Sequence, residues 1–289
     1  MKRTTIAVMN TKGGVGKSTL VLAIAETLTA IFNKTVLVID SDAQASVSAM
    51  LMTSMRLHKL QSEGTTIVDL LANTVLQQQP LEWSKFVVGG SSDVDDTNGL
   101  YLIPSDMQLT LFEREVSKEA LHGALRSTIQ ALLQSVRGAF DIVLIDCPPG
   151  LSILTESWLR EADFHISPTK PDYISVCGLE VFRRFKALNP EMGFAENLGV
   201  VVNLMDPNGA QDSDYDQWLR ERADNRCFSQ PVHRSVALQH VTQFSPDGRS
   251  WLAKYPGAVG ADIKSVSREL LQRVEAANMD RTTGGQVTV

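Results

Sequence analysis

The chain has 289 residues, of which 43% are hydrophobic, so it can bury a large core within one or two domains. Its 27 basic side chains stand against 33 acidic ones; the resulting net charge of -6 excludes a uniformly basic surface but allows a local basic patch. Three cysteines without C-x-x-C spacing, and five histidines without ligand spacing, argue against a metal or disulfide centre and indicate a reducing compartment.

Short apolar, β-branched runs alternate along the chain with longer helical patterns. Six runs predict strands, at residues 4–9, 35–39, 100–103, 141–145, 164–167 and 198–203. The clearest amphipathic patterns predict helices at residues 17–32 and 107–136. Several of the strands are apolar almost throughout, as strands buried on both faces are. The alternation therefore predicts an α/β fold with a mostly parallel central sheet and helices on both faces.

The organisation of the chain predicts a single domain over residues 1–289, because there is no internal repeat and no long linker. Residues 89–99 and 206–216 are polar and predict surface loops, and residues from 280 to 289 predict a frayed tail. The first apolar run is too short for the core of a signal peptide, and no stretch reaches the roughly 18 apolar residues of a membrane span. We therefore expect a cytoplasmic protein.

The strongest motif is N-T-K-G-G-V-G-K-S-T-L at residues 10–20, which follows a predicted strand and opens a predicted helix. Glycines permit positive φ angles and close approach, so the backbone N–H groups of residues 13–19 can surround phosphate oxygens. Lys17 would reach the β- and γ-phosphates, and the Ser18 hydroxyl would ligate Mg²⁺. The pattern G-x-x-x-x-G-K-[ST] begins here with Thr11 in place of glycine. Lys12 adds a second lysine that phosphate binding by itself does not explain.

The run K-G-G-V-G-K-S-T resembles the deviant Walker A motif of the ParA/MinD partition and positioning ATPases. It is most similar to the short members, in which no helix-turn-helix region precedes the loop, and it implies a P-loop NTPase-like fold. The resemblance implies that Lys12 reaches across a sandwich homodimer to the ATP held by the partner. At roughly 4 Å and an effective dielectric constant of 20, such a pair attracts by about 4 kcal/mol, so ATP should favour the dimer more than ADP does. The alternative is a solvated loop lysine.

The run V-L-V-I-D-S-D-A-Q-A-S at residues 36–46 resembles the switch I segment of the same family. The resemblance implies that Asp42 orients the attacking water and that Asp40 supports the Mg²⁺ shell, which is the positioning that phosphoryl transfer needs. The alternative is that both acids cap the next helix. Ala43 and Ala45 stand where the family usually has proline and glycine. We therefore expect switch movement, and with it the hydrolysis rate, to differ from the family norm.

The run F-D-I-V-L-I-D-C-P-P-G resembles the Walker B segment and delivers Asp146 at the carboxyl end of a strand. The resemblance implies that Asp146 holds Mg²⁺ through a water, and the alternative is a helix cap. We expect Cys147 to be a packing residue, because no histidine partner is evident.

Asn203 ends a predicted strand, and its amide could donate to and accept from an adenine edge. The run N-L-M-D at 203–206 could instead mimic the guanine-reading N-K-x-D motif, but its lysine is absent and the family uses ATP. A strand-end cap is a third possibility. The expected ATP-binding residues are Thr11, Lys12, Gly13, Gly14, Val15, Gly16, Lys17, Ser18, Thr19 and Asn203. The expected catalytic residues are Lys12, Lys17 and Asp42, and those near Mg²⁺ are Ser18, Asp40, Asp42 and Asp146.

ATP-bound dimers of the family bind a surface from which a partner protein releases them. Non-specific DNA is the surface we expect here, with a ParB-like activator and a nucleoid-associated location. The candidate phosphate contacts are Arg183, Arg184, Lys186, Arg220 and Arg222. The alternative for these residues is an ordinary solvated helix face.

Other members of the superfamily suggest competing functions. A positioning ATPase for a protein cluster or compartment would use the same nucleotide site with another cargo. The last helix lacks an aromatic or leucine anchor after it, which argues against membrane targeting. Iron–sulfur relatives need a cysteine where this chain has Ile153, so no cluster is expected. ATP-dependent ligases of the superfamily lack the D-x-D-x-Q pattern seen at residues 40–44.

Overall fold

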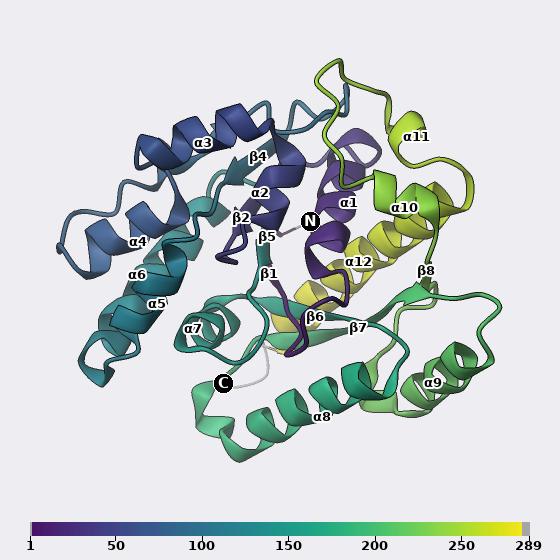
Figure 1. Cartoon of the computed structure of the whole chain (residues 1–289). Coiled ribbons are helices and arrows are strands. Elements are labelled where there is room, and N and C mark those ends of the chain that lie inside the picture. Colours follow the sequence, from purple (N-terminus) through teal and green to yellow (C-terminus); the bar gives the residue numbers. More distant parts are fainter. Residues whose placement is uncertain (1, 285–289) are drawn as a thin grey trace.

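The computed structural model describes the backbone of residues 2–284 and the side chains up to residue 281. Its centre is an eight-stranded sheet in the order β3-β4-β2-β5-β1-β6-β7-β8 (Figure 1). All neighbouring strands run parallel except β3, which pairs antiparallel with β4 at one edge. The strands are β1 (Thr4–Val8), β2 (Val36–Asp40), β3 (Val88–Gly89), β4 (Leu100–Ile103), β5 (Ile142–Asp146), β6 (Phe164–Thr169), β7 (Glu196–Met205) and β8 (Val232–His233).

All six strands predicted from the sequence are confirmed, and so is the mostly parallel sheet. The two strands that the sequence did not predict, β3 and β8, are two residues long each. A two-residue strand has no alternating pattern of its own. It forms because a neighbouring strand offers hydrogen-bonding groups, which only the folded sheet provides.

Helices cover both faces of the sheet, and the strands that they cover alternate their side chains between the two faces. In β2, for example, Val36 and Val38 enter one buried cluster, whereas Leu37 and Ile39 enter another. The helices are α1 (Lys17–Ala30), α2 (Ser46–Leu51), α3 (Ser54–Ser62), α4 (Ile67–Val75), α5 (Leu109–Val116), α6 (Glu119–Arg137), α7 (Ile153–Glu161), α8 (Tyr173–Leu188), α9 (Ala210–Glu221), α10 (Val236–His240), α11 (Trp251–Lys254) and α12 (Gly257–Gly284).

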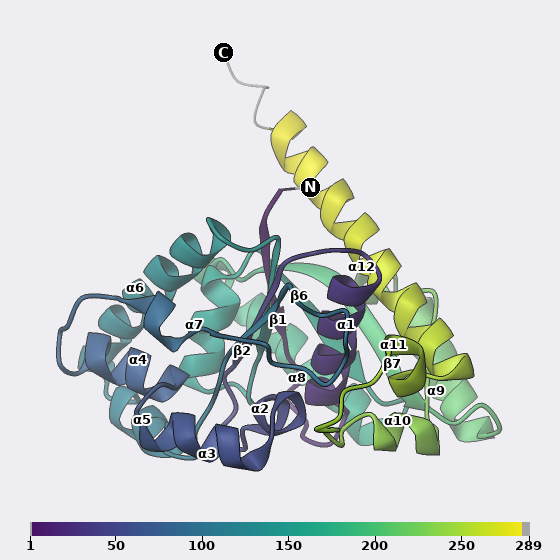
Figure 2. The same cartoon turned by 90° about the horizontal axis from the view of Figure 1, so that it is seen from above.

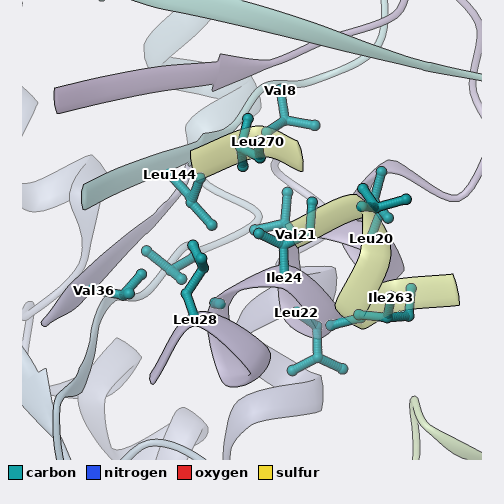
Figure 3. Packing of buried hydrophobic residues seen from close by; sticks show 14 of the residues in the cluster. Val8, Leu20, Val21, Leu22, Ile24, Leu28, Val36, Leu144, Ile263 and Leu270 are labelled. Atoms are coloured by element: carbon teal, nitrogen blue, oxygen red, sulfur yellow. The ribbon is translucent and has the colours of Figure 1, made fainter. Parts of the chain in front are cut away.

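On one face, α1 packs beside the long helix α12, as Figure 2 shows. Leu22 and Ile24 of α1 and Ile263 and Leu270 of α12 are fully buried in the same cluster (Figure 3). On the other face, α4, α5, α6 and α7 enclose the second cluster. Because α1 is buried against both the sheet and α12, the loop that precedes α1 stands on a rigid support.

Three local predictions need correction. The pattern at residues 107–136 is broken at residues 117–118 into the two helices α5 and α6. The predicted loop at 206–216 is helical from Ala210, as the start of α9. The last helix continues to Gly284, past the expected start of the tail, because Arg281 packs over the Phe164 ring and bonds to Asp163. Residues 285–289 of the expected tail lie outside the described residues.

The polar loop at residues 89–99 is docked against α1 by buried charges. The Lys254 ammonium lies 2.7 Å from Glu26 of α1 and 2.5 Å from Asp93 of the loop, and these three side chains are fully buried. The Tyr255 hydroxyl donates to Glu26, and Arg249 pairs with Asp93. Burial, followed by the charge of Glu26, raises the pKa of Tyr255 well above its usual value. This network joins the loop, α1 and α11, which lie far from one another in the sequence.

We expect Lys254→Met to lower the free energy of unfolding by about 3–5 kcal/mol, because it leaves Glu26 buried without a cation and Asp93 paired with Arg249 alone. Urea denaturation followed by circular dichroism measures this loss. The control is Lys59→Met on exposed helix α3, which should change stability by less than about 0.5 kcal/mol. Equal stability of the two variants would show that the network contributes little.

Candidate nucleotide site

The register of three central strands brings the predicted acids to one edge of the sheet. Asp146 of β5 lies opposite Val8 of β1 and opposite Asp40 of β2. The carboxyl ends of parallel strands share one edge, and β1 lies where the chain turns from building one side of the sheet to the other. This is the place at which open α/β sheets bind ligands.

In the glycine loop after β1, two positions have backbone angles that favour glycine. Gly14 and Gly16 have φ angles of 77° and 80°, in the left-handed region that favours glycine. A Cβ atom on Gly16 would also lie 2.5 Å from the Asn203 amide nitrogen. Gly13 and Gly14 have open space beside them, which leaves their backbone accessible to a ligand.

Three contacts fix this loop to the neighbouring elements. The Asn10 amide donates to Pro168 O at 2.8 Å, at the end of β6. The Thr11 hydroxyl donates to Gly178 O of α8 at 2.9 Å. The Asn203 amide donates to Val15 O at 2.8 Å, from β7. Asn203 thus supports the loop from the strand beside it, and contact between Asn203 and adenine stays a prediction.

The loop leads into α1, whose first turn can receive an anion. Gly16, at the N-cap, provides no side-chain hydrogen bond, and the first turn contains no acidic residue. The N–H groups there are therefore available to phosphate oxygens, and the helix dipole favours negative charge. Lys17 is only 6% exposed. Beside the loop is a cavity of about 530 Å³, whose lining includes Gly13, Gly14, Gly16, Lys17, Ser18, Thr19 and Asp42.

Asp146 is a buried carboxylate without a partner. Neither of its oxygens accepts a hydrogen bond from any residue that the structure describes. Burial, followed by the charge of Asp40, raises the pKa of Asp146 well above its usual value, and the nearby Ser18 hydroxyl, followed by the charge of Lys17, opposes the rise. Such a group is stabilised by a cation and its waters, so the site fits Mg²⁺. Within the described residues no three acidic, histidine or cysteine side chains form a metal cage, so phosphate oxygens and the Ser18 hydroxyl would have to complete the shell.

Asp40 is fully buried and already bonded. It accepts from the Ser48 backbone at 2.9 Å and from the Ser48 hydroxyl at 2.7 Å, and its other oxygen accepts from the Asp42 backbone. Burial raises the pKa of Asp40 to about 6, although the Ser48 bonds oppose the rise. Asp40 therefore ties the end of β2 to the start of α2, while its expected role in the Mg²⁺ shell stays a prediction. Asp42 is partly exposed and lines the cavity.

Ala45 occupies a backbone conformation that suits glycine. Its φ and ψ angles are 50° and 36°, and it stands at the N-cap of α2 without a capping side chain. Its N–H donates to Asp42 O at 2.9 Å, which closes the turn that carries Asp42. Left-handed angles cost a residue with a Cβ atom about 1–2 kcal/mol. The turn beside the predicted water-positioning residue is therefore strained.

Unlike Lys17, Lys12 does not line the cavity beside the loop. Its ammonium is 3.6 Å from Asp172, at the N-cap of α8, and its side chain is 32% exposed. Lys170 pairs with the same carboxylate at 3.4 Å. Hydrogen bonds from Ser175, followed by Lys12 and Lys170, outweigh the effect of partial burial and lower the pKa of Asp172. In the single chain a surface ion pair thus holds Lys12 next to residues 13–19, the loop and helix start that we call the phosphate cradle.

A second cavity of about 520 Å³ continues from Gly14, Gly16 and Thr19 to the segment around α10. This wall of the site was not predicted from the sequence. It includes Lys170, Leu204, Arg234, Ser235, Leu238, Gln239 and Thr242. Leu204, directly after Asn203, has a φ angle of 58°. No sequence motif predicts these positions, because β8 and α10 are distant from the loop in the sequence and lie beside it only in the folded chain. Their position beside the phosphate cradle suits the base and sugar of a nucleotide.

Cys147 is fully buried, and burial raises the pKa of its thiol, which agrees with a packing role. Within the described residues no helix is long and apolar enough to cross a membrane.

The candidate DNA contacts are mostly engaged within the chain. Arg183 pairs with Glu180 and Asp224, and Arg222 pairs with Glu180 and packs against the Trp218 ring. Arg220 pairs with Asp216, and Lys186 lies over the Phe182 ring. Arg184 is exposed and makes no hydrogen bond or ion pair with a described residue. The five cations therefore do not form one free basic surface.

Comparison with known proteins agrees with this geometry. A family model described as AAA domain (AAA_31) matches residues 3–192. A ParA family protein from Chlamydia pneumoniae is 30% identical over 274 residues, which cover 92% of this chain and 97% of that protein. The chain belongs to the ParA family. The chromosome partitioning protein ParA of Caulobacter vibrioides is 27% identical over 245 residues, covering 83% of this chain and 84% of that protein.

Solved structures share the ParA-family fold of this chain. The structure of apo McdA from Cyanothece has a TM-score of 0.75 at 20% identity and covers 93% of this chain and 99% of its own. Cobyrinic acid a,c-diamide synthase from Mycobacterium smegmatis, bound to an ATP analogue and magnesium, has a TM-score of 0.74 at 22% identity, with 95% and 97% covered. At these identities the likeness establishes the P-loop NTPase-like fold and not the reaction.

We expect Asp146→Asn to raise the free energy of unfolding of the nucleotide-free protein by about 1–3 kcal/mol at pH 7, because it removes a carboxyl whose pKa burial raises in the folded state. A carboxyl whose pKa is raised in the folded state lowers stability once the pH exceeds the pKa of the same carboxyl in the unfolded chain. The gain should therefore shrink as the pH falls toward about 4, where the unfolded carboxyl is protonated as well. The same variant should lose Mg²⁺-dependent nucleotide affinity. Urea denaturation across pH and nucleotide titration measure both.

The control for this variant is Asp141→Asn. Thr35 donates two hydrogen bonds to Asp141, and they lower its pKa against the opposing effect of burial. This variant should leave stability equal or reduced at pH 7. A loss of stability in Asp146→Asn like that of the control would show that burial does not raise the pKa of Asp146.

We expect Ala45→Gly to stabilise the nucleotide-free protein by about 0.5–1 kcal/mol, since glycine relieves the left-handed strain. The matched control is Ala49→Gly, an exposed position within the same short helix. There glycine should cost about 0.5–1 kcal/mol. Chemical denaturation of both variants gives the sign, and a loss at both positions would show that Ala45 is unstrained.

Proposed function

We propose that this protein is an Mg²⁺-dependent ATPase that dimerises around ATP, binds non-specific DNA in that state, and serves DNA partition in the cytoplasm. The observation that carries the proposal is the separation of the two lysines. Lys17 is buried and lines the cavity beside the loop, whereas Lys12 lies outside this cavity and pairs with Asp172. A lysine that does not line the cavity of its own chain supports a role at the cavity of a second copy.

The residues of one chain divide the work of binding and hydrolysis. The N–H groups of the loop and the first turn of α1 bind the phosphates, and Lys17 neutralises their charge. Bound Mg²⁺ would neutralise further charge, held by the Ser18 hydroxyl and, through a water, by Asp146. Asp42, on the strained turn at the cavity wall, would orient the attacking water. Lys12 of each copy would neutralise phosphate charge on the other.

The relatives support partition as the process, since one is named a chromosome partitioning protein and solved neighbours include plasmid partition proteins from Borrelia burgdorferi. We propose that a ParB-like protein stimulates hydrolysis and that the ATP dimer is associated with the nucleoid. Arg184 is the candidate contact to DNA phosphate that has no partner within the described part of the chain.

A positioning ATPase for a protein cluster is the second candidate, favoured by the match to McdA. It would have the same nucleotide site and a different cargo. A ligase function is less well supported, because the synthase shares only the fold at 22% identity.

We expect Lys12→Ala to bind ATP within about threefold of the unaltered protein yet to remain a monomer with Mg·ATP, because it loses the charge that crosses the interface. Light scattering with Mg·ATP and with Mg·ADP measures the dimer, and a fluorescent ATP analogue measures binding. In the same assays Lys17→Ala should lose ATP binding itself.

The control for Lys12→Ala is Lys59→Ala, which removes a positive charge from an exposed position on α3. It should dimerise as the unaltered protein does. Normal dimerisation of Lys12→Ala would refute action across the interface, and tight ATP binding by Lys17→Ala would refute the phosphate assignment.

We expect random duplex DNA to bind the protein with Mg·ATP and not with Mg·ADP, with affinity that falls steeply as salt rises. Arg184→Ala should weaken this binding and reduce the salt dependence, because each dimer loses two phosphate contacts. Fluorescence anisotropy across a salt titration measures both, and Arg114→Ala, in α5, is the charge-matched control. Absence of binding in both nucleotide states would reject DNA as the surface and leave the protein-cluster function.

A further inference from the structure

A third cavity, of about 200 Å³, lies between α8 and the neighbouring strands β6 and β7. Its walls are apolar at Leu179, Phe182 and Val200. None of its lining residues lines the two nucleotide cavities. Two of the basic residues predicted to contact DNA, Arg183 and Lys186, line it.

The charges around this cavity leave one cation uncompensated. Arg183 and Arg222 share the carboxylates of Glu180 and Asp224, so these two cations and two anions cancel. Lys186 has no carboxylate within ion-pair distance among the described residues; its ammonium lies 5.6 Å from the Phe182 ring centre. Partial burial lowers the pKa of Lys186. A half-buried ammonium without a counter-ion favours the binding of an anion.

Two further polar side chains line the cavity from β6. Ser167 is 3% exposed, and its hydroxyl has no hydrogen-bond partner in the part of the chain that the structure describes. His165 is also 3% exposed, and its Nδ1 lies 2.9 Å from Ala195 O. A carbonyl only accepts, so Nδ1 carries the proton and Nε2 is an acceptor. Burial, followed by the charge of Lys186, lowers the pKa of His165 to about 3, which keeps the ring neutral.

We propose that this cavity binds a small organic carboxylate, with Lys186 and Ser167 donating to the carboxylate and Leu179, Phe182 and Val200 packing against its apolar part. An uncompensated ammonium and a free hydroxyl provide two donors for two carboxylate oxygens. Inorganic phosphate fits less well, because it has no apolar part and the neutral His165 offers it no charge. The site goes beyond the proposed function and does not depend on it.

The cavity shares helix α8 with the nucleotide site. Gly178 of α8 accepts the Thr11 hydroxyl of the phosphate loop, one residue before Leu179, which lines the cavity. The helix that a ligand would contact on one side is therefore the helix that supports the loop on the other.

The probe for the test is 4-fluorobenzoate, followed by ¹⁹F NMR on the full chain saturated with Mg·ADP, so that the nucleotide site is occupied. We expect saturable binding with a dissociation constant on the order of 1 mM, as suits a ligand of few atoms. Lys186→Met should weaken it at least about tenfold, and Ser167→Ala about threefold. The matched control is Arg184→Met, which removes a charge from the exposed side of the same helix and should leave binding unchanged.

Several results would overturn the proposal. One is the absence of saturation below about 10 mM probe. A second is equal weakening of probe binding by Lys186→Met and Arg184→Met, which would indicate a non-specific charge effect. A third is displacement of the probe by an equal concentration of inorganic phosphate, which would assign the site to phosphate. Circular dichroism checks that each variant is folded. If Lys186→Met does not fold, loss of affinity in Ser167→Ala against Arg184→Met supports the proposal, and unchanged affinity rejects it.

Discussion

Two buried carboxylates side by side are the constraint on which the site depends. The register of β2 and β5 sets Asp40 opposite Asp146 at the sheet edge, and both are fully buried. Ser48 satisfies Asp40, while Asp146 has no hydrogen-bond partner among the described residues. An apolar sheet that holds such a charge is stabilised when a cation arrives, so binding free energy and stability are linked at this point.

The phosphate loop is positioned by close backbone approach as much as by its own glycines. Asn203 lies so near Gly16 that a Cβ atom there would overlap its amide, and the same amide bonds to Val15 O. Thr11 ties the loop to α8 in a similar way. The loop is thus held between β7 and α8, and both of these elements also line the third cavity.

Two further features lie next to the site. The buried Lys254 network contacts α1 through Glu26, and the strained turn at Ala45 carries Asp42. In the first, the buried Glu26 and Asp93 carboxylates are paired with Lys254, Arg249 and the Tyr255 hydroxyl. The second stores backbone strain in a segment that holds Asp42. Movement of this turn on nucleotide binding stays a prediction.

The sequence by itself determined the six long strands, the parallel sheet and the phosphate loop, because continuous apolar runs and the glycine–lysine pattern are local signals. It also placed Asp40 and Asp146 at strand ends. Only the tertiary structure decided that Ser48 donates hydrogen bonds to Asp40 and that Asn203 supports the loop. It also decided that α10 lines the second cavity and that Arg183 and Lys186 line the third. These outcomes depend on strand register and on contacts between distant segments, to which no local pattern in a single sequence corresponds.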